Sequence, residues 1–244
     1  MKKVNQENKN ALSFFIFIGV GAGAGFLLLF LFPAPPIYFN QVEARVLNYS
    51  AYDHILVVKP LLTANAYKKG GFYDYYQGNC DESCLSVQID KNIPYTYDSS
   101  LRAIVRFEKL GATMADDYTL DPKDLAKYDR IILLHNEYVT QEFFDAVQNH
   151  PNVIYMYPNT LYGKVSVQNG KMTLIEGHGY KGKDNGFGWN YDNTRPYEED
   201  NICDNIHWIR VPNGLQLNCF PENFLMKNTW LFGFVRDVDP TKFI

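Results

Sequence analysis

Two short apolar runs that each end in polar residues place the strongest constraint on the fold of this chain. Residues 131–134 are followed by His135-Asn136-Glu137, and residues 153–157 are followed by Pro158 and Asn159. Buried parallel strands form continuous apolar runs, and open α/β sheets bind ligands beyond the carboxyl ends of such strands. The pattern therefore predicts an α/β sheet with His135, Glu137 and Asn159 as candidate site residues at one edge.

Strand and helix signals alternate along residues 54–159. They predict a strand at 54–60, a helix from Ser99 or Ser100 through Leu110, a short helix from Asp121, a strand at 129–134, a helix capped by Thr140, and a strand at 153–157. In the first of these helices, Leu101, Ile104, Val105 and Leu110 are expected on the buried side. This alternation predicts a three-layer, doubly wound and mostly parallel sheet.

The pattern changes after residue 159. Residues 164–167 and 172–175 are predicted to form a hairpin around the turn Asn169-Gly170. Residues 178–221 show little periodicity, and so long an irregular stretch is usually functional or held by disulfides. We expect one exterior domain at residues 50–244, with an irregular, disulfide-braced part at about 178–221.

The N-terminal region carries a membrane-anchor signal. Residues 12–32 contain no charged side chain and are almost wholly apolar. At about 1.5 Å per residue, a helix of this length covers roughly 30 Å, the thickness of a bilayer core. Lys2, Lys3 and Lys9 precede it, which predicts a cytoplasmic tail at 1–11 and a domain outside the cell membrane.

A cleaved signal peptide is the alternative interpretation of residues 12–32. Its apolar region is usually shorter, about 7–15 residues, and no clear cleavage site precedes the proline-rich start of the segment 33–49. We therefore expect a retained single-pass anchor in contact with membrane lipid. The segment 33–49 is expected to be a stiff linker, because prolines favour extended chain.

The four cysteines all follow the predicted anchor. An even number of cysteines outside the cell favours disulfides, and sequence proximity suggests Cys80–Cys84 and Cys203–Cys219 among three connectivities. Zinc is the alternative, but Cys80 and Cys84 have no second close pair of ligands downstream. Asn48 begins the sequon Asn-Tyr-Ser and is a glycosylation candidate.

Charge argues against nucleic acid as a partner. The formal net charge is −4, and no basic run occurs outside the flank of the anchor. Nucleic-acid binding depends on clustered Lys and Arg that neutralise phosphates. We therefore expect a small-molecule substrate or a surface ligand.

Several elements in matching order resemble one known family. They are Pro60-x-x-Thr63-x-x-Ala66-Tyr67-x-x-Gly70-Gly71, Pro94-Tyr95, His135-x-Glu137-Tyr138 and Asn159-x-Leu161-Tyr162. This set resembles the C-terminal domain of the large subunit of N,N-dimethylformamidase, which has a glutamine-amidotransferase-like fold. The resemblance covers roughly residues 50–165. It implies an amidotransferase-like fold and a hydrolase that cleaves a small amide or related C–N bond.

The resemblance also implies a mononuclear iron site. By position, Tyr67, Tyr95 and Glu137 would be the metal ligands, His135 would transfer a proton near neutral pH, and Asn159 would orient the substrate or stabilise an oxyanion. Phenolate and carboxylate oxygens are hard ligands that suit a hard cation such as ferric iron. The family adds a small partner subunit, so a partner subunit or an oligomer is a further expectation.

Two other functions stay open from the sequence. The first is a non-catalytic binding module on the same fold, in which the aromatic and polar segment 184–197, with Trp189, resembles a sugar-binding face in composition. The second is a calcium site in the same region, although its acidic residues lack the spacing of a known calcium loop. These residues are Asp184, Asp192, Glu198, Glu199 and Asp200.

Overall fold

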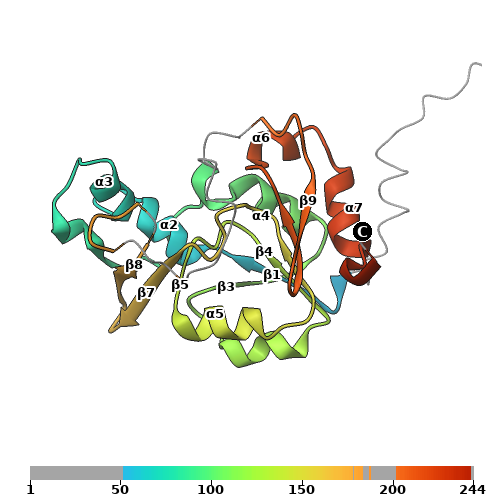
Figure 1. Cartoon of the computed structure of the whole chain (residues 1–244), viewed down its shortest axis with the longest axis horizontal. Helices are drawn as coiled ribbons and strands as arrows, with labels where there is room; N and C mark the ends of the chain where they lie inside the picture. Colours follow the sequence, from blue (N-terminus) through green and yellow to red (C-terminus); the bar gives the residue numbers. More distant parts are fainter. Residues whose placement is uncertain (1–51, 178, 184–186, 188–201, 243–244) are drawn as a thin grey trace, which may run out of the picture. The chain divides into compact units, whose positions relative to one another are not determined.

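The computed structural model describes residues 52–177, 179–183, 187 and 202–242, which form two β-sheets with helices packed against them (Figure 1). The six-stranded main sheet has the order β3 (Thr113–Asp116), β1 (Ile55–Lys59), β4 (Arg130–Leu133), β6 (Val153–Tyr155), β10 (Gly214–Leu217) and β9 (Trp208–Val211). Neighbouring strands are parallel except β10 and β9, which pair antiparallel. The chain therefore has an α/β fold with a parallel-rich sheet.

Helices cover both faces of the main sheet. One face holds α4 (Leu101–Lys109), α6 (Glu222–Leu225) and α7 (Trp230–Asp237), and the other holds α5 (Gln141–Gln148) and the 3₁₀ helix η4 (Pro122–Lys127). Successive residues of a strand point to opposite faces. In β4, Ile132 accordingly packs toward α4 and α7, whereas Ile131 and Leu133 pack toward α5 and η4. Figure 1 shows α4 and α5 on opposite sides of the strands.

A second, four-stranded sheet extends from one end of the first. Its order is β2 (Ser86–Gln88), β8 (Lys171–Glu176), β7 (Gly163–Gln168) and β5 (Tyr138–Val139). It packs with α2 (Leu61–Tyr67) and α3 (Phe72–Tyr76) around a core that includes Leu62, Phe72 and Tyr138. Short 3₁₀ helices η2 (Glu82–Leu85), η3 (Tyr97–Ser99) and η5 (Pro240–Lys242) complete the described elements.

Several sequence predictions are confirmed. The predicted strands correspond to β1, β4 and β6, and the predicted hairpin is β7–β8. The helix predicted up to Leu110 is α4, and the Thr140 side chain caps α5 by accepting a 3.2 Å hydrogen bond from the Phe143 amide. The short helix after Asp121 is the 3₁₀ helix η4, whose cap Asp121 accepts from the Lys123 amide at 3.0 Å.

Both expected disulfides are present. Cys80 is bonded to Cys84, and Cys203 is bonded to Cys219. A disulfide sulfur cannot act as a zinc thiolate, so the zinc alternative is not supported. The second disulfide joins the segment before β9 to the segment just after β10, and both of its cysteines are buried in the core.

The prediction of irregular structure through residue 221 is wrong for residues 208–217. This segment forms the hairpin of β9 and β10, and β10 inserts beside β6 as a strand of the main sheet. Each of these strands is interrupted by a polar residue, Arg210 in β9 and Gln216 in β10, so neither shows the continuous apolar run of a buried strand. The turn signal Asn213-Gly214 lies between them.

Two local predictions are also corrected. Leu101 and Val105 are 41% and 39% exposed, because α4 buries the row formed by Ala103, Ile104 and Phe107 instead. The ring of Phe107 makes this row the more apolar one. The sequence signals also predicted no helix between the strand at 54–60 and Ser99, whereas this segment contains α2 and α3, with the turn at Gly70-Gly71 between them.

Several predictions fall outside the described residues. These are the tail 1–11, the anchor 12–32, the linker 33–49, the glycosylation candidate Asn48, and Trp189 with the acidic residues 184, 192 and 198–200. Among the helices that the structure does describe, none has both the length and the apolar character needed to cross a membrane.

Candidate active site at the carboxyl edge of the main sheet

The segment that follows β4 is held by hydrogen bonds from two other elements. The backbone amide of His135 donates to Ser100 Oγ at 3.0 Å, and that of Glu137 donates to Thr63 Oγ1 at 2.9 Å. Ser100 lies in the left-handed region, with φ of 65°, at the start of α4, and Thr63 lies on α2. Three elements that are distant in sequence thus fix the loop that carries His135 and Glu137.

Tyr67, His135 and Glu137 meet at one carboxylate oxygen. The Tyr67 hydroxyl donates to Glu137 Oε2 at 2.8 Å, and His135 Nε2 lies 3.5 Å from the same oxygen. His135 and Glu137 are buried, whereas Tyr67 is partly exposed. The structure therefore brings together three of the five site residues expected from the sequence.

The tautomer of His135 is set by its surroundings. Its Nδ1 lies 2.5 Å from the carbonyl oxygen of Asp98, which can only accept, so Nδ1 carries the proton and Nε2 presents a lone pair. The ring stacks on Tyr157 and meets the edge of Phe220. Burial in this aromatic setting lowers the pKa of His135 to about 4, although the Asp98 carbonyl and Asn159 favour the charged form. The ring is therefore neutral at neutral pH.

Asn159 follows β6 and is 1% exposed. Its side chain lies near enough to His135 to favour the protonated ring. Within the described part of the chain, however, Asn159 Oδ1 and Nδ2 have no hydrogen-bond partner, and neither has His135 Nε2. A hydrogen bond requires both a short distance and a favourable angle, so proximity alone does not make one. A buried polar atom without a partner costs about 1–3 kcal/mol, so this group marks a place where a bound molecule would gain hydrogen bonds.

A buried carboxyl group at the end of β3 supports the same loop. Asp117 accepts hydrogen bonds from Asn136 Nδ2 at 2.9 Å and from the Leu62 amide at 3.0 Å. Burial raises the pKa of Asp117 to about 7. The sequence did not point to Asp117, because β3 was not predicted. If β3 had been recognised as a strand, the position of Asp117 directly after it would have marked this residue as a site candidate.

Tyr95 occupies a different setting from Tyr67. It is partly buried against the core cluster of α4 and α7, and Lys59 Nζ lies 5.9 Å from its ring centroid. Burial, followed by the charges of Asp117 and Asp116, raises the pKa of its phenol. A hydrogen bond therefore joins Tyr67 to Glu137, whereas Tyr95 lies beside Lys59.

A stack of tyrosines leads from the site to the surface. Tyr67 stacks on Tyr73 with ring centroids 4.8 Å apart, and Tyr73 stacks on Tyr76, which is 52% exposed. The stack depends on the reversal at Gly70-Gly71, where a Cβ on Gly71 would lie 2.3 Å from the Ala66 carbonyl oxygen. These rings form one wall beside Glu137.

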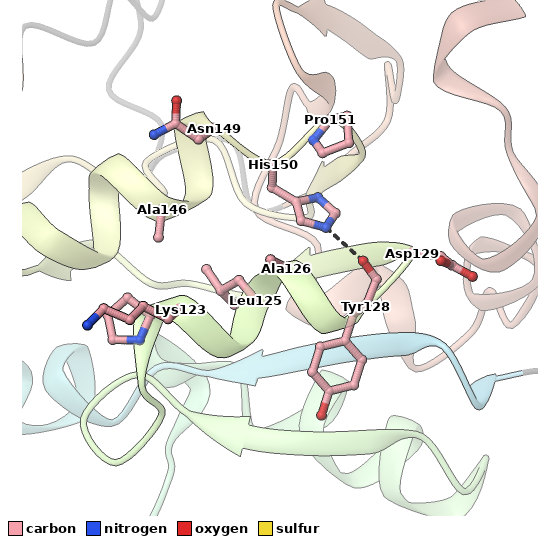
Figure 2. A pocket seen from close by; sticks show the side chains of 10 residues that line it. Lys123, Leu125, Ala126, Tyr128, Asp129, Ala146, Asn149, His150 and Pro151 are labelled. Atoms are coloured by element: carbon pink, nitrogen blue, oxygen red, sulfur yellow. Dashed lines mark hydrogen bonds between the residues drawn. The ribbon is translucent and has the colours of Figure 1, made fainter.

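A groove lies at the opposite edge of the sheet, near the starts of β4 and β6. It has a volume of about 580 Å³ and is lined by residues of η4 and the end of α5 (Figure 2). His150 in this groove uses both ring nitrogens, because Nε2 donates to the Tyr128 carbonyl at 2.9 Å and Nδ1 accepts from the Asn152 amide at 3.2 Å. With its histidine committed to the backbone, this groove is the weaker candidate for catalysis.

Within the described residues, no three His, Cys, Asp or Glu side chains gather as metal ligands. The ligand set implied by the resemblance is of another kind, since two of its three members are tyrosines. No protein-family model and no curated protein matches this sequence.

Proposed function

We propose that this site is the active site of a hydrolase that cleaves a small amide or a related C–N bond, on an amidotransferase-like, doubly wound fold. The observation that carries the proposal is the buried group of polar atoms without partners beside the Glu137 carboxylate. An amide substrate and a water molecule complement it. The substrate carbonyl would accept from Asn159 Nδ2, and the water would donate to His135 Nε2.

Hydrolysis of an amide requires proton movements that His135 and Asn159 could perform. The water oxygen bonds to the carbonyl carbon while one water proton moves to His135 Nε2, and this proton then passes to the nitrogen as the C–N bond breaks. Asn159 Nδ2 would stabilise the negative charge on the carbonyl oxygen. Because the pKa of His135 is low, the ring would hold the proton only briefly, with the Glu137 carboxylate stabilising the imidazolium.

Iron is the cofactor that we propose, with Tyr67, Tyr95 and Glu137 as its ligands. The oxygens of Tyr67 and Glu137 are 2.8 Å apart, and two anionic oxygens at this distance repel unless a proton or a cation lies between them. Here the phenol proton fills that role, and a ferric ion suits the same pair of hard oxygens. When bound, iron would supply Lewis-acid polarisation of the substrate carbonyl. Tyr95 packs against the core cluster of α4 and α7 beside Lys59, so its role as the third ligand requires its own test.

Metal analysis of the purified full chain tests the iron proposal. After loading with ferric iron, we expect one iron per chain and a tyrosinate-to-iron absorption band in the visible range. Tyr67→Phe should lose both, whereas Tyr75→Phe is the matched control, because Tyr75 stacks on Tyr180 rather than contacting Glu137. Iron content that is absent, or unchanged in Tyr67→Phe, would reject this ligand set.

Turnover is tested separately with small formamides and acetamides by following amine release. We expect release by the iron-loaded chain and a loss of at least 100-fold in His135→Gln. Binding of these amides without amine release would favour the non-catalytic binding module. Neither binding nor release by the iron-loaded chain would reject this substrate class.

A further inference from the structure

A second groove, between α4 and the segment around α6, carries positive charge. Its volume is about 440 Å³, and it is lined by Leu101, Arg102, Val105, Arg106, Lys109, Leu225, Met226 and Thr229. Three of these eight side chains are cationic and none is acidic, although the whole chain has a formal net charge of −4. We call this surface the basic groove. Its charge complements an anionic partner.

The basic groove also exposes several large apolar side chains. Leu101, Val105 and Met226 are 41%, 39% and 67% exposed, and Trp230, next to the lining residue Thr229, is 50% exposed. Exposed apolar side chains that occur together, with polar residues at the rim, mark interaction surfaces. Tryptophan beside Arg and Lys is the combination found on helices that lie at a membrane surface.

The described chain begins on the same side of the domain. The Tyr52 hydroxyl donates to the Phe232 carbonyl of α7 at 3.1 Å, and its ring meets the edge of Phe107 on α4. Arg106, which lines the basic groove, lies over the ring of Phe232. The chain that comes from the predicted anchor therefore enters the domain beside the basic groove.

With an anchor at 12–32, the length of the segment between the anchor and the domain would limit how far the domain can lie from a membrane. Residues 33–51, at about 3.4 Å per residue, extend at most roughly 65 Å. An anchor at 12–32 would thus keep the basic groove at a high local concentration near lipid headgroups. Each Lys or Arg close to an anionic membrane strengthens binding about fivefold.

We propose that the basic groove, with Trp230 at its margin, docks on an anionic lipid surface. The exposed apolar side chains of α4, Met226 and Trp230 enter the headgroup layer while Arg106 and Lys109 contact lipid phosphates. Arg102, whose Nη1 already donates to the Glu222 carbonyl and to Asn223 Oδ1, adds its positive charge to the groove. This proposal is independent of the chemistry at Glu137. It assigns a role to Leu101 and Val105, which the packing of the domain leaves exposed.

The test uses the full chain in nanodiscs, one copy per disc, made of phosphatidylcholine alone or with about 30% phosphatidylglycerol. Lipids with brominated acyl chains quench tryptophan fluorescence on contact, and comparison with Trp230→Phe isolates the signal of Trp230. We expect quenching of Trp230 in the anionic discs, at least twofold weaker in neutral discs and weakened again by 0.5 M salt.

A matched pair of variants separates the groove from general surface charge. Lys109→Glu with Met226→Glu should abolish the quenching, whereas Lys171→Glu with Ile175→Glu, the same changes on the exposed side of β8, should leave it unchanged. Equal thermal stability of the two variants confirms that both fold. Equal quenching in neutral and anionic discs, or equal loss in both variants, overturns the proposal. In separate discs that hold two copies, crosslinks between copies through Met226, without quenching, would overturn the lipid proposal and assign the surface to a second copy.

Discussion

The phenol of Tyr67 donates a 2.8 Å hydrogen bond to Glu137 Oε2 across 70 positions of sequence. It joins the end of α2 to the loop after β4, and through the shared oxygen it places His135 Nε2 3.5 Å from the same carboxylate. A single contact thus couples the partly exposed wall of the site to its buried centre.

Removing this contact should lower stability in the iron-free protein. Hydrogen bonds to charged groups contribute about 1.5–3 kcal/mol, so Tyr67→Phe and Glu137→Leu, each of which removes one partner, should show a coupling free energy in this range. Urea unfolding of both single variants and of the double variant measures it. Strictly additive effects would mean that the hydrogen bond contributes nothing to folding.

Asp117 should make stability depend on pH. Burial raises its pKa from 3.8 to about 7, so the folded state holds this proton more tightly than the unfolded chain does. Stability therefore falls as pH rises from about 4 to about 7 and levels off above. Relative to Asp117→Asn, the free energy of unfolding of the natural chain should drop by up to about 3 kcal/mol between pH 5 and pH 8. Parallel pH curves for the two proteins would contradict this.

Thr63 should be needed for the geometry of the loop after β4. Its Oγ1 accepts from the amides of Glu137 at 2.9 Å and Tyr138 at 3.3 Å, and the residue is fully buried. Thr63→Val keeps the shape but leaves two buried N–H groups without an acceptor, at a cost of about 1–3 kcal/mol. Thr63→Ser retains the hydroxyl and should recover most of this stability, as thermal unfolding would show. Equal losses in both variants would instead point to packing.

Glu222 should stabilise the start of α4 from another element. Ser100 makes no side-chain cap bond there, and Glu222 instead accepts from the amides of Arg102 at 2.9 Å and Ala103 at 3.2 Å and from the Tyr157 hydroxyl at 2.6 Å. Glu222→Gln replaces one acceptor oxygen with a donor, so we expect a loss of about 1–3 kcal/mol. The control is Glu142→Gln in the exposed first turn of α5, which should change stability by less than about 0.5 kcal/mol.

Much of the sheet could be predicted because its signals are local. The apolar runs at β1, β4 and β6, the Thr140 cap and the Asn169-Gly170 turn each act within a few residues, and each is confirmed. The strands β3 (TMAD), β9 (WIRV) and β10 (GLQL) were not predicted, because none of them is a continuous apolar run like those of β4 and β6. Their conformation follows from the strands with which they pair.

The sequence by itself determined the α/β pattern and the placement of His135, Glu137 and Asn159 just after strands. It favoured both disulfide pairs among three connectivities, and the tertiary structure decided them. Tertiary structure decided which of these residues act together. It joined Tyr67 to Glu137 but set Tyr95 beside Lys59, and it added Asp117, Thr63 and Glu222 as buried partners. Hydrogen bonds between residues far apart in sequence depend on how helices dock on the sheet. Local patterns in the sequence do not reveal how the helices dock.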